Sequence, residues 1–395
     1  MGMEVPFSSR SGWDRRPTSL AQRRAALLRA GVPLIDLTES NPTRCGFSYP
    51  AGDILGAIAT PAGLTYEPDP CGLLHAREVV AAAYPGVDAS RVVLTASTSE
   101  AYGWLFKLLC EEGDEVLTPA PSYPLFDFIA QLEGVRIVRY PLTYDVGWHL
   151  DMAPLVEAVH ERARALIVVH PNNPTGSFLS AEEIEFLRGF CAKRGLAIIS
   201  DEVFAGYTLR DTQKPKTLVG GGPALTFSLG GLSKAAGLPQ MKLSWIVASG
   251  PESLQREALA RLEIIGDTFL SVGTPVQRGL GRLLEAGRAV GDQIRDRVRA
   301  NWGFVRGHAK PESMWEGLEA EAGWYGVVRV PEIMSDEEWA LRLLDMDRVH
   351  VHPGELFDFP GGGYLVVSLL PRPEEFREGF RRLAARADNE STGGV

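Results

Sequence analysis

The chain has little of three features that would narrow its class quickly: cysteine, net positive charge and long apolar runs. Its 395 residues include only 4 cysteines, and no two of them form a CxxC pair. This spacing favours reduced thiols in a cytosol over a disulfide framework or a zinc site. The 7 histidines form no HExxH motif, so we predict no metal site.

Charge and hydropathy exclude further classes of protein. The 50 acidic residues outnumber the 40 basic ones and give a formal net charge of −10, which disfavours a nucleic acid or an anionic membrane as partner. No apolar run approaches the roughly 18 residues that a membrane helix requires. The N-terminus also lacks the basic-then-apolar layout of a signal peptide. We therefore predict a soluble, cytoplasmic protein.

Short apolar runs alternate with helical segments from about residue 90 onward. Continuous apolar strands that are separated by helices are typical of a buried, mainly parallel sheet. We therefore predict an α/β fold whose large domain contains a seven-stranded sheet flanked by helices. The seven predicted strands are 91–95, 115–118, 135–139, 165–169, 196–200, 224–228 and 244–248.

The pattern changes after about Thr274. A long helical segment to about Asn301 leads into antiparallel-looking strands near 325–330 and 364–368, which predict a smaller α+β domain. We divide the chain accordingly into three parts: an N-terminal segment that joins the small domain, the large domain and the small C-terminal domain. Their bounds are 1–44, 45–280 and 281–395.

Two polar segments follow neighbouring predicted strands of the large domain. Thr98 and Ser99 open a helix directly after strand 91–95, and free N–H groups at a helix N-terminus bind phosphate well. Serine and threonine are also ordinary helix caps, so this signal is weak alone. Tyr123 lies between prolines after the next strand, where its ring could stack on a flat ligand or plug the edge of the core.

Two further strand ends carry an amide and a carboxylate. Asn173 belongs to HPNNPTG after strand 165–169, and its flanking prolines direct the side-chain amide toward a ligand oxygen. Asp201 ends strand 196–200, and a buried aspartate must be paired or hydrogen-bonded. A protonated pyridine nitrogen is a suitable partner for Asp201, whereas a helix cap is the structural alternative.

Lys234 follows a short apolar strand and two glycines in SLGGLSK. A lysine at the mouth of a sheet is partly desolvated, which lowers its pKa. A neutral amine can attack an aldehyde to form a Schiff base. An isolated Ser-Lys pair is more often a surface loop, and it is the polar strand ends upstream that favour a reactive lysine here.

Together these motifs resemble the class I/II aminotransferase family of fold-type I enzymes, which depend on pyridoxal 5′-phosphate and are related to aspartate aminotransferase. HPNNPTG, SDEVF and the SK of Lys234 carry the resemblance, and it spans nearly the whole chain. Tyr66 and Gly72 look like the family's early tyrosine-to-glycine motif, and Pro353–Phe357 looks like the Pro-Gly…Phe motif of its small domain.

The resemblance implies a role for each of these residues. Lys234 would form the aldimine with the cofactor and shuttle the proton, Asp201 would pair with the pyridine nitrogen, and Asn173 would hold the phenolic oxygen beside the substrate. Tyr123 would stack on the ring. The remaining cofactor contacts, all to the phosphate, would come from Thr98, Ser99, Lys242 and, across a homodimer interface, Tyr66.

The chain departs from the family at several of these positions. Phe204 replaces a tyrosine that donates to the phenolic oxygen, Lys242 replaces the phosphate arginine, and Gly231 replaces a frequent hydroxyl residue. The C-terminal arginine that clamps the substrate carboxylate is absent, because its position falls near Val366. Arg44 is our candidate for a substitute cation, followed by Arg372.

The function implied is an aminotransferase that exchanges an amino group between an amino acid and a 2-oxo acid by a ping-pong mechanism. The missing clamp keeps open an alternative: a lyase, decarboxylase or cyclising enzyme that uses the same cofactor and fold. The donor and acceptor do not follow from the sequence.

Overall fold

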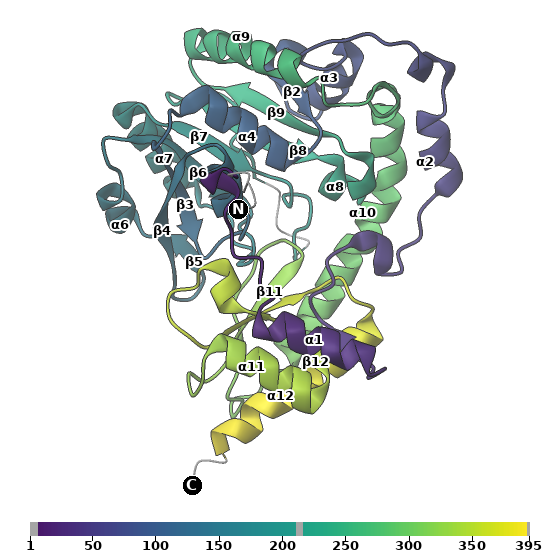
Figure 1. Cartoon of the computed structure of the whole chain (residues 1–395), viewed down its shortest axis with the longest axis vertical. Helices are drawn as coiled ribbons and strands as arrows, with labels where there is room; N and C mark the ends of the chain where they lie inside the picture. Colours follow the sequence, from purple (N-terminus) through teal and green to yellow (C-terminus); the bar gives the residue numbers. More distant parts are fainter. Residues whose placement is uncertain (1–6, 211–215, 393–395) are drawn as a thin grey trace, which may run out of the picture.

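A computed structural model describes residues 7–210 and 216–392 of the chain (Figure 1). A large part is built on an eight-stranded sheet and a smaller part on a four-stranded sheet. In Figure 1 the large part lies above the small one, and the long helix α10 (Thr274–His308) runs from one to the other.

The large sheet contains all seven predicted strands and one more. Its order is β2-β9-β8-β7-β6-β3-β4-β5, with parallel pairing from β8 to β4. β9 runs antiparallel to both of its neighbours. The prediction of seven strands was one short, because β5 adds a three-residue hairpin partner to β4. The bounds are β2 Val92–Thr95, β3 Glu115–Ala120, β4 Arg136–Tyr144, β5 Trp148–Leu150, β6 Ala163–Val169, β7 Ala197–Asp201, β8 Thr226–Gly231 and β9 Ser244–Ser249.

Helices cover both faces of this sheet, which explains why its central strands are apolar throughout rather than alternating. Successive residues of a strand point to opposite faces, so Ile167 joins a core with α4, α5 and α9, whereas Leu166 joins a core with α7. The helices of the large part are α2 Ala51–Ile58, α3 Leu74–Ala81, α4 Thr98–Leu109, α5 Phe126–Leu132, α6 Met152–Glu157, α7 Ala181–Arg194, α8 Leu232–Ala235 and α9 Glu252–Phe269.

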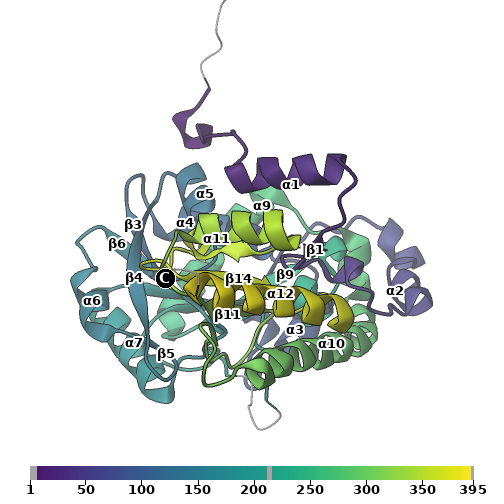
Figure 2. The same ribbon diagram turned by 90° about the horizontal axis from the view of Figure 1, so that it is seen from below.

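The small part is an antiparallel sheet of order β10-β11-β14-β13 with helices packed against it (Figure 2). A separate parallel pair, β1 with β12, attaches the N-terminal segment to it. The elements are α1 Ser19–Arg29, β1 Ile35–Asp36, β10 Glu316–Gly317, β11 Tyr325–Arg329, α11 Asp336–Arg342, β12 Val349–His350, β13 His352–Pro353, β14 Tyr364–Ser368 and α12 Pro373–Thr392. The domain bounds at 44 and 280 stay predictions, and α10 continues across residue 280.

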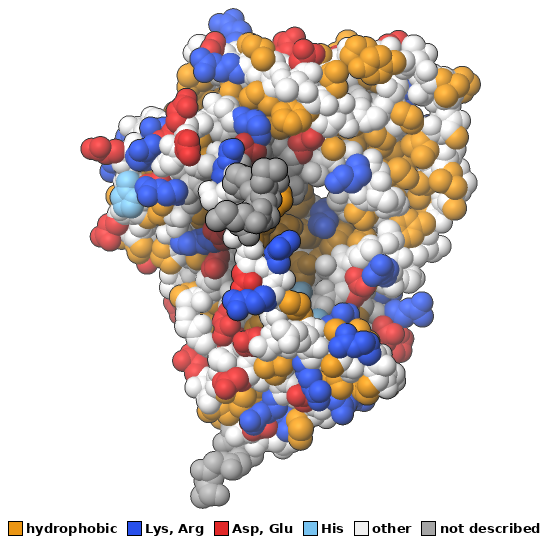
Figure 3. All heavy atoms as spheres, viewed as in Figure 1, with side chains coloured by type: hydrophobic (Ala, Val, Ile, Leu, Met, Phe, Trp, Pro, Cys, Tyr) orange, Lys and Arg blue, Asp and Glu red, His pale blue; other side chains and the backbone are white. Residues whose placement is uncertain are grey.

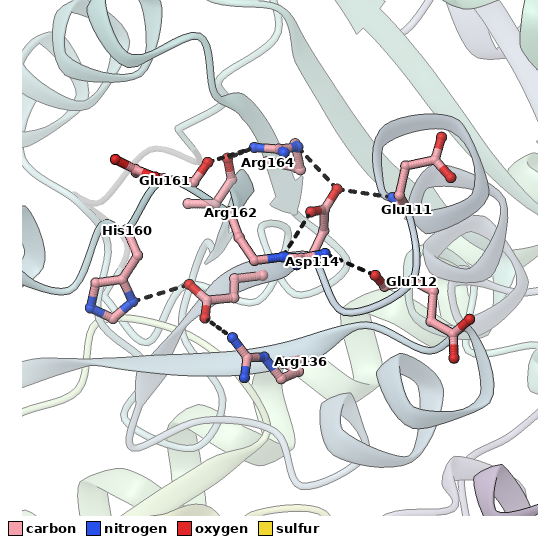
Figure 4. Close-up of polar contacts among 10 residues, drawn as sticks. Glu111, Glu112, Asp114, Arg136, His160, Glu161, Arg162 and Arg164 are labelled. Atoms are coloured by element: carbon pink, nitrogen blue, oxygen red, sulfur yellow. Dashed lines mark hydrogen bonds and ion pairs between the residues drawn. The ribbon is translucent and has the colours of Figure 1, made fainter.

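The amino edge of the large sheet is closed by a cluster of ion pairs (Figure 4). Asp114 and Glu115, at the start of β3, have side chains that are only 3% and 7% exposed. Arg164 lies 3.0 Å from Asp114, while Arg136 and His160 lie 2.5 and 3.1 Å from Glu115. Because these buried acids are paired, the cluster is a structural element of this edge. A cavity opens at the opposite, carboxyl edge.

Among the described residues, no helix is both long and apolar enough to cross a lipid bilayer. Within the same ranges, no three His, Cys, Asp or Glu side chains come together as a metal site would require.

Candidate active site

A cavity of about 320 Å³ opens at the carboxyl edge of the large sheet, between the two parts of the molecule. In open α/β sheets this edge is where ligands bind. Six of the predicted residues line it: Thr98, Ser99, Tyr123, Asn173, Asp201 and Lys234. They come from segments as far apart as α4 and α8, so the fold brings together what the sequence distributes over more than a hundred residues.

Lys234 stands in α8, the short helix that follows the β8 glycines. Its amine lies 4.6 Å from the ring centroid of Trp324 and 5.3 Å from that of Phe204. Burial lowers the pKa of Lys234 to about 8, although the charge of Asp201 acts in the opposite direction. A larger fraction of this amine is therefore neutral and nucleophilic near physiological pH than for an exposed lysine.

Asp201 ends β7 and is held by two donors. Its Oδ2 accepts a hydrogen bond of 3.1 Å from the Tyr102 hydroxyl, and its Oδ1 accepts one of 3.1 Å from the Val203 N–H. Burial raises the pKa of Asp201, while both hydrogen bonds oppose that rise. A buried carboxylate that faces a cavity is suited to a cationic ligand group.

The two asparagines of HPNNPTG differ in their contacts. Asn172 stabilises the loop, because its Oδ1 accepts from the Thr175 hydroxyl at 2.9 Å and its Nδ2 donates to the Pro121 carbonyl at 3.3 Å. Asn173 lines the cavity, and its Oδ1 is buried with no hydrogen-bond partner among the described residues. The amide of Asn173 is therefore left for a ligand.

The start of α4 lines the cavity with Ser97, Thr98 and Ser99. Ser97 caps the helix by accepting from the Glu100 N–H at 3.1 Å. The Glu100 carboxylate turns back and accepts from the Ala96 N–H and the Ser271 hydroxyl, both at 2.6 Å. Because that acid is occupied, the helix start at Thr98 and Ser99 can accept an anion.

Tyr123 lines the cavity with its ring edge-on to Phe126, at a centroid distance of 5.9 Å. Burial raises its pKa to about 12, so the phenol stays neutral. An aromatic ring in this position can cover a flat ligand.

Three predicted residues do not line the cavity of this chain. Tyr66 is 73% exposed, and Lys242 and Arg44 are exposed as well. Tyr66 instead lies in a separate groove beside Gly72 and Leu270.

Other residues of the site gave no signal in the sequence. Ser40, Ser233, Ser244 and Tyr325 line the cavity, and Trp324 covers the lysine. Tyr102, on α4, donates its hydroxyl to Asp201, and no local sequence pattern pointed to this contact. Ser40, Trp324 and Tyr325 reach the site only through tertiary packing of the small part.

Comparison with known proteins gives a consistent family assignment. A family model described as aminotransferase class I and II matches residues 66–382. The chain is 27% identical to alanine aminotransferase of Mycobacterium tuberculosis over 92% of this chain and 87% of that protein. It is 24% identical to human tyrosine aminotransferase, over 90% of this chain and 84% of the relative. A single mutant of Thermus thermophilus aspartate aminotransferase shares the fold, with a TM-score of 0.84 at 22% identity over 97% of this chain and 100% of the other.

Proposed function

The chain belongs to the class I and II aminotransferase family and is a pyridoxal-phosphate-dependent aminotransferase; we propose that it transfers an amino group between an amino acid and a 2-oxo acid at Lys234. The main support for this proposal is the position of Lys234. Its half-buried amine, with a pKa lowered to about 8, shares one cavity with the Asp201 carboxylate and the unpaired amide of Asn173.

The residues of the cavity fit pyridoxal 5′-phosphate. The Nδ2 of Asn173, a residue that lines the cavity, can donate to the phenolic oxygen, and the Asp201 carboxylate suits a protonated ring nitrogen. Tyr123 supplies an aromatic face, and the N-terminus of α4 suits a phosphate. When bound, the cofactor supplies an aldehyde for amine exchange and a ring that withdraws electrons from the reacting carbon.

The chain's own residues then bind, orient and move protons. In its free base form, the Nζ of Lys234 would remove the proton from the α-carbon of the substrate and return it to the aldehyde carbon of the bound cofactor. Asp201, which accepts hydrogen bonds from the Tyr102 hydroxyl and the Val203 N–H, would hold the ring nitrogen of the cofactor in its protonated form. The rings of Phe204 and Trp324 lie 5.3 and 4.6 Å from the amine and bury it on that side. Two half-reactions that use the same amine give ping-pong kinetics.

The proposal assigns the substrate carboxylate to Arg44. This residue ends a short turn at Pro42–Arg44, four residues after Ser40, which lines the cavity. Arg44 and the alternative Arg372 are both exposed, and neither has an ion pair among the described residues. Val366, at the position of the missing clamp, is fully buried in the core and carries no charge.

The proposal also includes a homodimer in the cytoplasm. Apolar side chains gather on the surface of the large part over α2 and the start of α10 (Figure 3). Leu64 and Tyr66 are 90% and 73% exposed on this side, and Leu270 is 39% exposed. Patches of this kind mark protein interfaces, and a second copy would bury Tyr66 near a neighbouring cofactor phosphate. The four cysteines are free, which suits a reducing compartment.

Borohydride reduction tests the proposal directly. The protein loaded with cofactor should absorb in the visible range, bleach on reduction and carry the label on Lys234 in a peptide map. Amino acids from a panel should change the absorption of the loaded protein when they are substrates. Lys234→Ala should remain folded, take no label and have no turnover. A label on another lysine would contradict the assignment.

A further inference from the structure

We propose that Ser244 binds the cofactor phosphate through its hydroxyl, in place of the hydroxyl that Gly231 lacks. This inference rests on the proposed function, because it assigns a new residue to the same site. It concerns a serine that no motif singled out and that lies ten residues after the reactive lysine.

The strand arrangement brings Ser244 to the phosphate end of the cavity. β9 runs antiparallel to its neighbours, so its first residue meets the last residues of β2 and β8. Ser244 pairs with Thr95 on one side and with Gly231 on the other. Thr95 leads into the N-terminus of α4, and Gly231 leads into α8 with Lys234. Ser244 therefore stands between the anion-binding helix start and the lysine.

Gly231 is the residue that leaves room for the hydroxyl of Ser244. A Cβ built on Gly231 would lie 2.3 Å from Ser244 Oγ and 3.0 Å from Ser244 Cβ. Residues that pair directly across an antiparallel ladder project to the same face of the sheet. A side chain at position 231 would overlap the present position of the Ser244 hydroxyl, so the two positions compete for the same space. The absence of a side chain at Gly231 therefore leaves the space that the Ser244 hydroxyl occupies.

The hydroxyl of Ser244 is available for a ligand. Its residue is 2% exposed and lines the cavity, and its Oγ makes no hydrogen bond within residues 7–210 and 216–392. The neighbouring hydroxyls are engaged: Thr95 donates to the Ser97 carbonyl at 3.1 Å, and Ser97 caps α4. A hydroxyl that lines a cavity can donate to an anion bound there.

Titration of two cofactor forms tests this role. Pyridoxal 5′-phosphate and unphosphorylated pyridoxal are titrated into the cofactor-free wild type and into Ser244→Ala, with binding followed by absorption. The variant should bind the phosphorylated form about tenfold more weakly, the effect of one charge-assisted hydrogen bond, and pyridoxal unchanged. Ser249→Ala is the matched control. Ser249 is also buried on β9, at the far end of the strand, and should leave both affinities unchanged.

An exchange of the two positions provides a second test. Gly231→Ser alone should lower the melting temperature, because the new side chain overlaps Ser244. Combined with Ser244→Gly it should regain most of the affinity for the phosphorylated form, since one hydroxyl is again present. If Ser244→Ala does not fold, Ser244→Cys answers the same question, because it keeps a similar volume and loses the strong donor.

The titrations distinguish failure of the role proposed for Ser244 from failure of the proposed function. Equal binding of the phosphorylated form by wild type and Ser244→Ala overturns the role of Ser244. An equal loss for both cofactor forms also overturns it, because the residue then shapes the site without contacting phosphate. If the wild type binds neither form, the proposed function itself fails.

Discussion

The amine of Lys234 lies 4.6 Å from the ring centroid of Trp324, so a side chain next to β11 of the small part covers the reactive group of the large part. Trp324 is fully buried, with Phe204 and Tyr207 packed edge-on against it at centroid distances of 5.4 and 5.1 Å. These rings bury the amine on one side. Because burial is the cause of the lowered pKa of Lys234, contact between the two parts contributes to it.

The lowered pKa makes a prediction about stability. Below pH 8 the lysine is charged in both states and the folded protein bears its desolvation cost. Between about 8 and 10.5 the unfolded chain binds more protons, so stability rises with pH. We expect Lys234→Met to raise the free energy of unfolding of the cofactor-free protein by about 1–3 kcal/mol at pH 7. The gain should shrink above pH 8 and disappear above 10.5.

Urea unfolding of wild type and variant from pH 6 to 11 measures this difference. Lys193→Met is the control, since Lys193 is an exposed residue on α7. A gain for Lys234→Met that stays constant over this pH range would mean that the effect comes from packing and not from charge.

Tyr102→Phe tests whether the hydrogen bond from the Tyr102 hydroxyl keeps Asp201 ionised. The Tyr102 hydroxyl lowers the pKa of Asp201 against the effect of burial, so its loss should raise that pKa further. We expect kcat to fall about tenfold or more, as for loss of a hydrogen bond to a charged group. The acidic limb of the pH–rate profile should move to higher pH.

Tyr140→Phe is the matched control for Tyr102→Phe. Tyr140 is equally buried and donates to the Ile167 carbonyl at 2.7 Å, but it belongs to β4 and does not line the cavity. It should lower stability and leave the pH profile unchanged. Identical pH–rate profiles for Tyr102→Phe and Tyr140→Phe would show that the Tyr102 hydroxyl does not set the pKa of Asp201.

The strand-end residues of the site could be predicted because their signals are local. Asn173 and Asp201 each follow a continuous apolar strand, and such strands end at one edge of a parallel sheet. Lys234 follows a strand and two glycines in the same way. The seven long strands were predictable for the same reason, whereas β5 has only three residues and no distinct period.

The rest of the site depends on tertiary contacts that no local pattern encodes. Tyr325 begins β11 of the smaller sheet and Trp324 directly precedes it, and nothing in their sequence neighbourhood shows that they reach the cavity of Lys234. The close approach of Gly231 to Ser244 could not be predicted from the sequence. It depends on the pairing register of β8 with β9, which neither strand determines alone. The positions of Tyr66, Lys242 and Arg44 relative to a ligand stay predictions.

A test with mixed subunits addresses Tyr66. Tyr66 is 73% exposed and does not line the cavity of its own chain, which is expected of a residue that serves a neighbouring site. Tyr66→Ala and Lys234→Ala homodimers should both be inactive or nearly so. Refolding the two together should restore part of the activity, since one of the two sites in each hybrid dimer keeps both residues. Hybrids that form and remain inactive would show that sites are not shared.

The last prediction concerns Arg44 and the substrate carboxylate. Truncating one member of a buried charge pair costs about 2–5 kcal/mol, but Arg44 is exposed in the cofactor-free chain and water screens part of its charge. We therefore expect Arg44→Ala to weaken amino-acid binding by about ten- to a hundredfold. Cofactor affinity should change little, because the cavity residues that hold the cofactor remain. Half-reaction titrations followed by absorption give both quantities.

Arg372→Ala provides the comparison, because Arg372 lies beside Gly46, close in sequence to Arg44, and is likewise without an ion pair among the described residues. If only Arg44→Ala weakens amino-acid binding, the assignment of the substrate carboxylate to Arg44 is supported. If only Arg372→Ala weakens it, Arg372 is the residue that binds the carboxylate. If neither variant changes the half-reaction, the carboxylate is bound by other groups or the substrate carries none beside the amine. Primary amines without a carboxylate should then react as well as amino acids, and the same titration measures that directly.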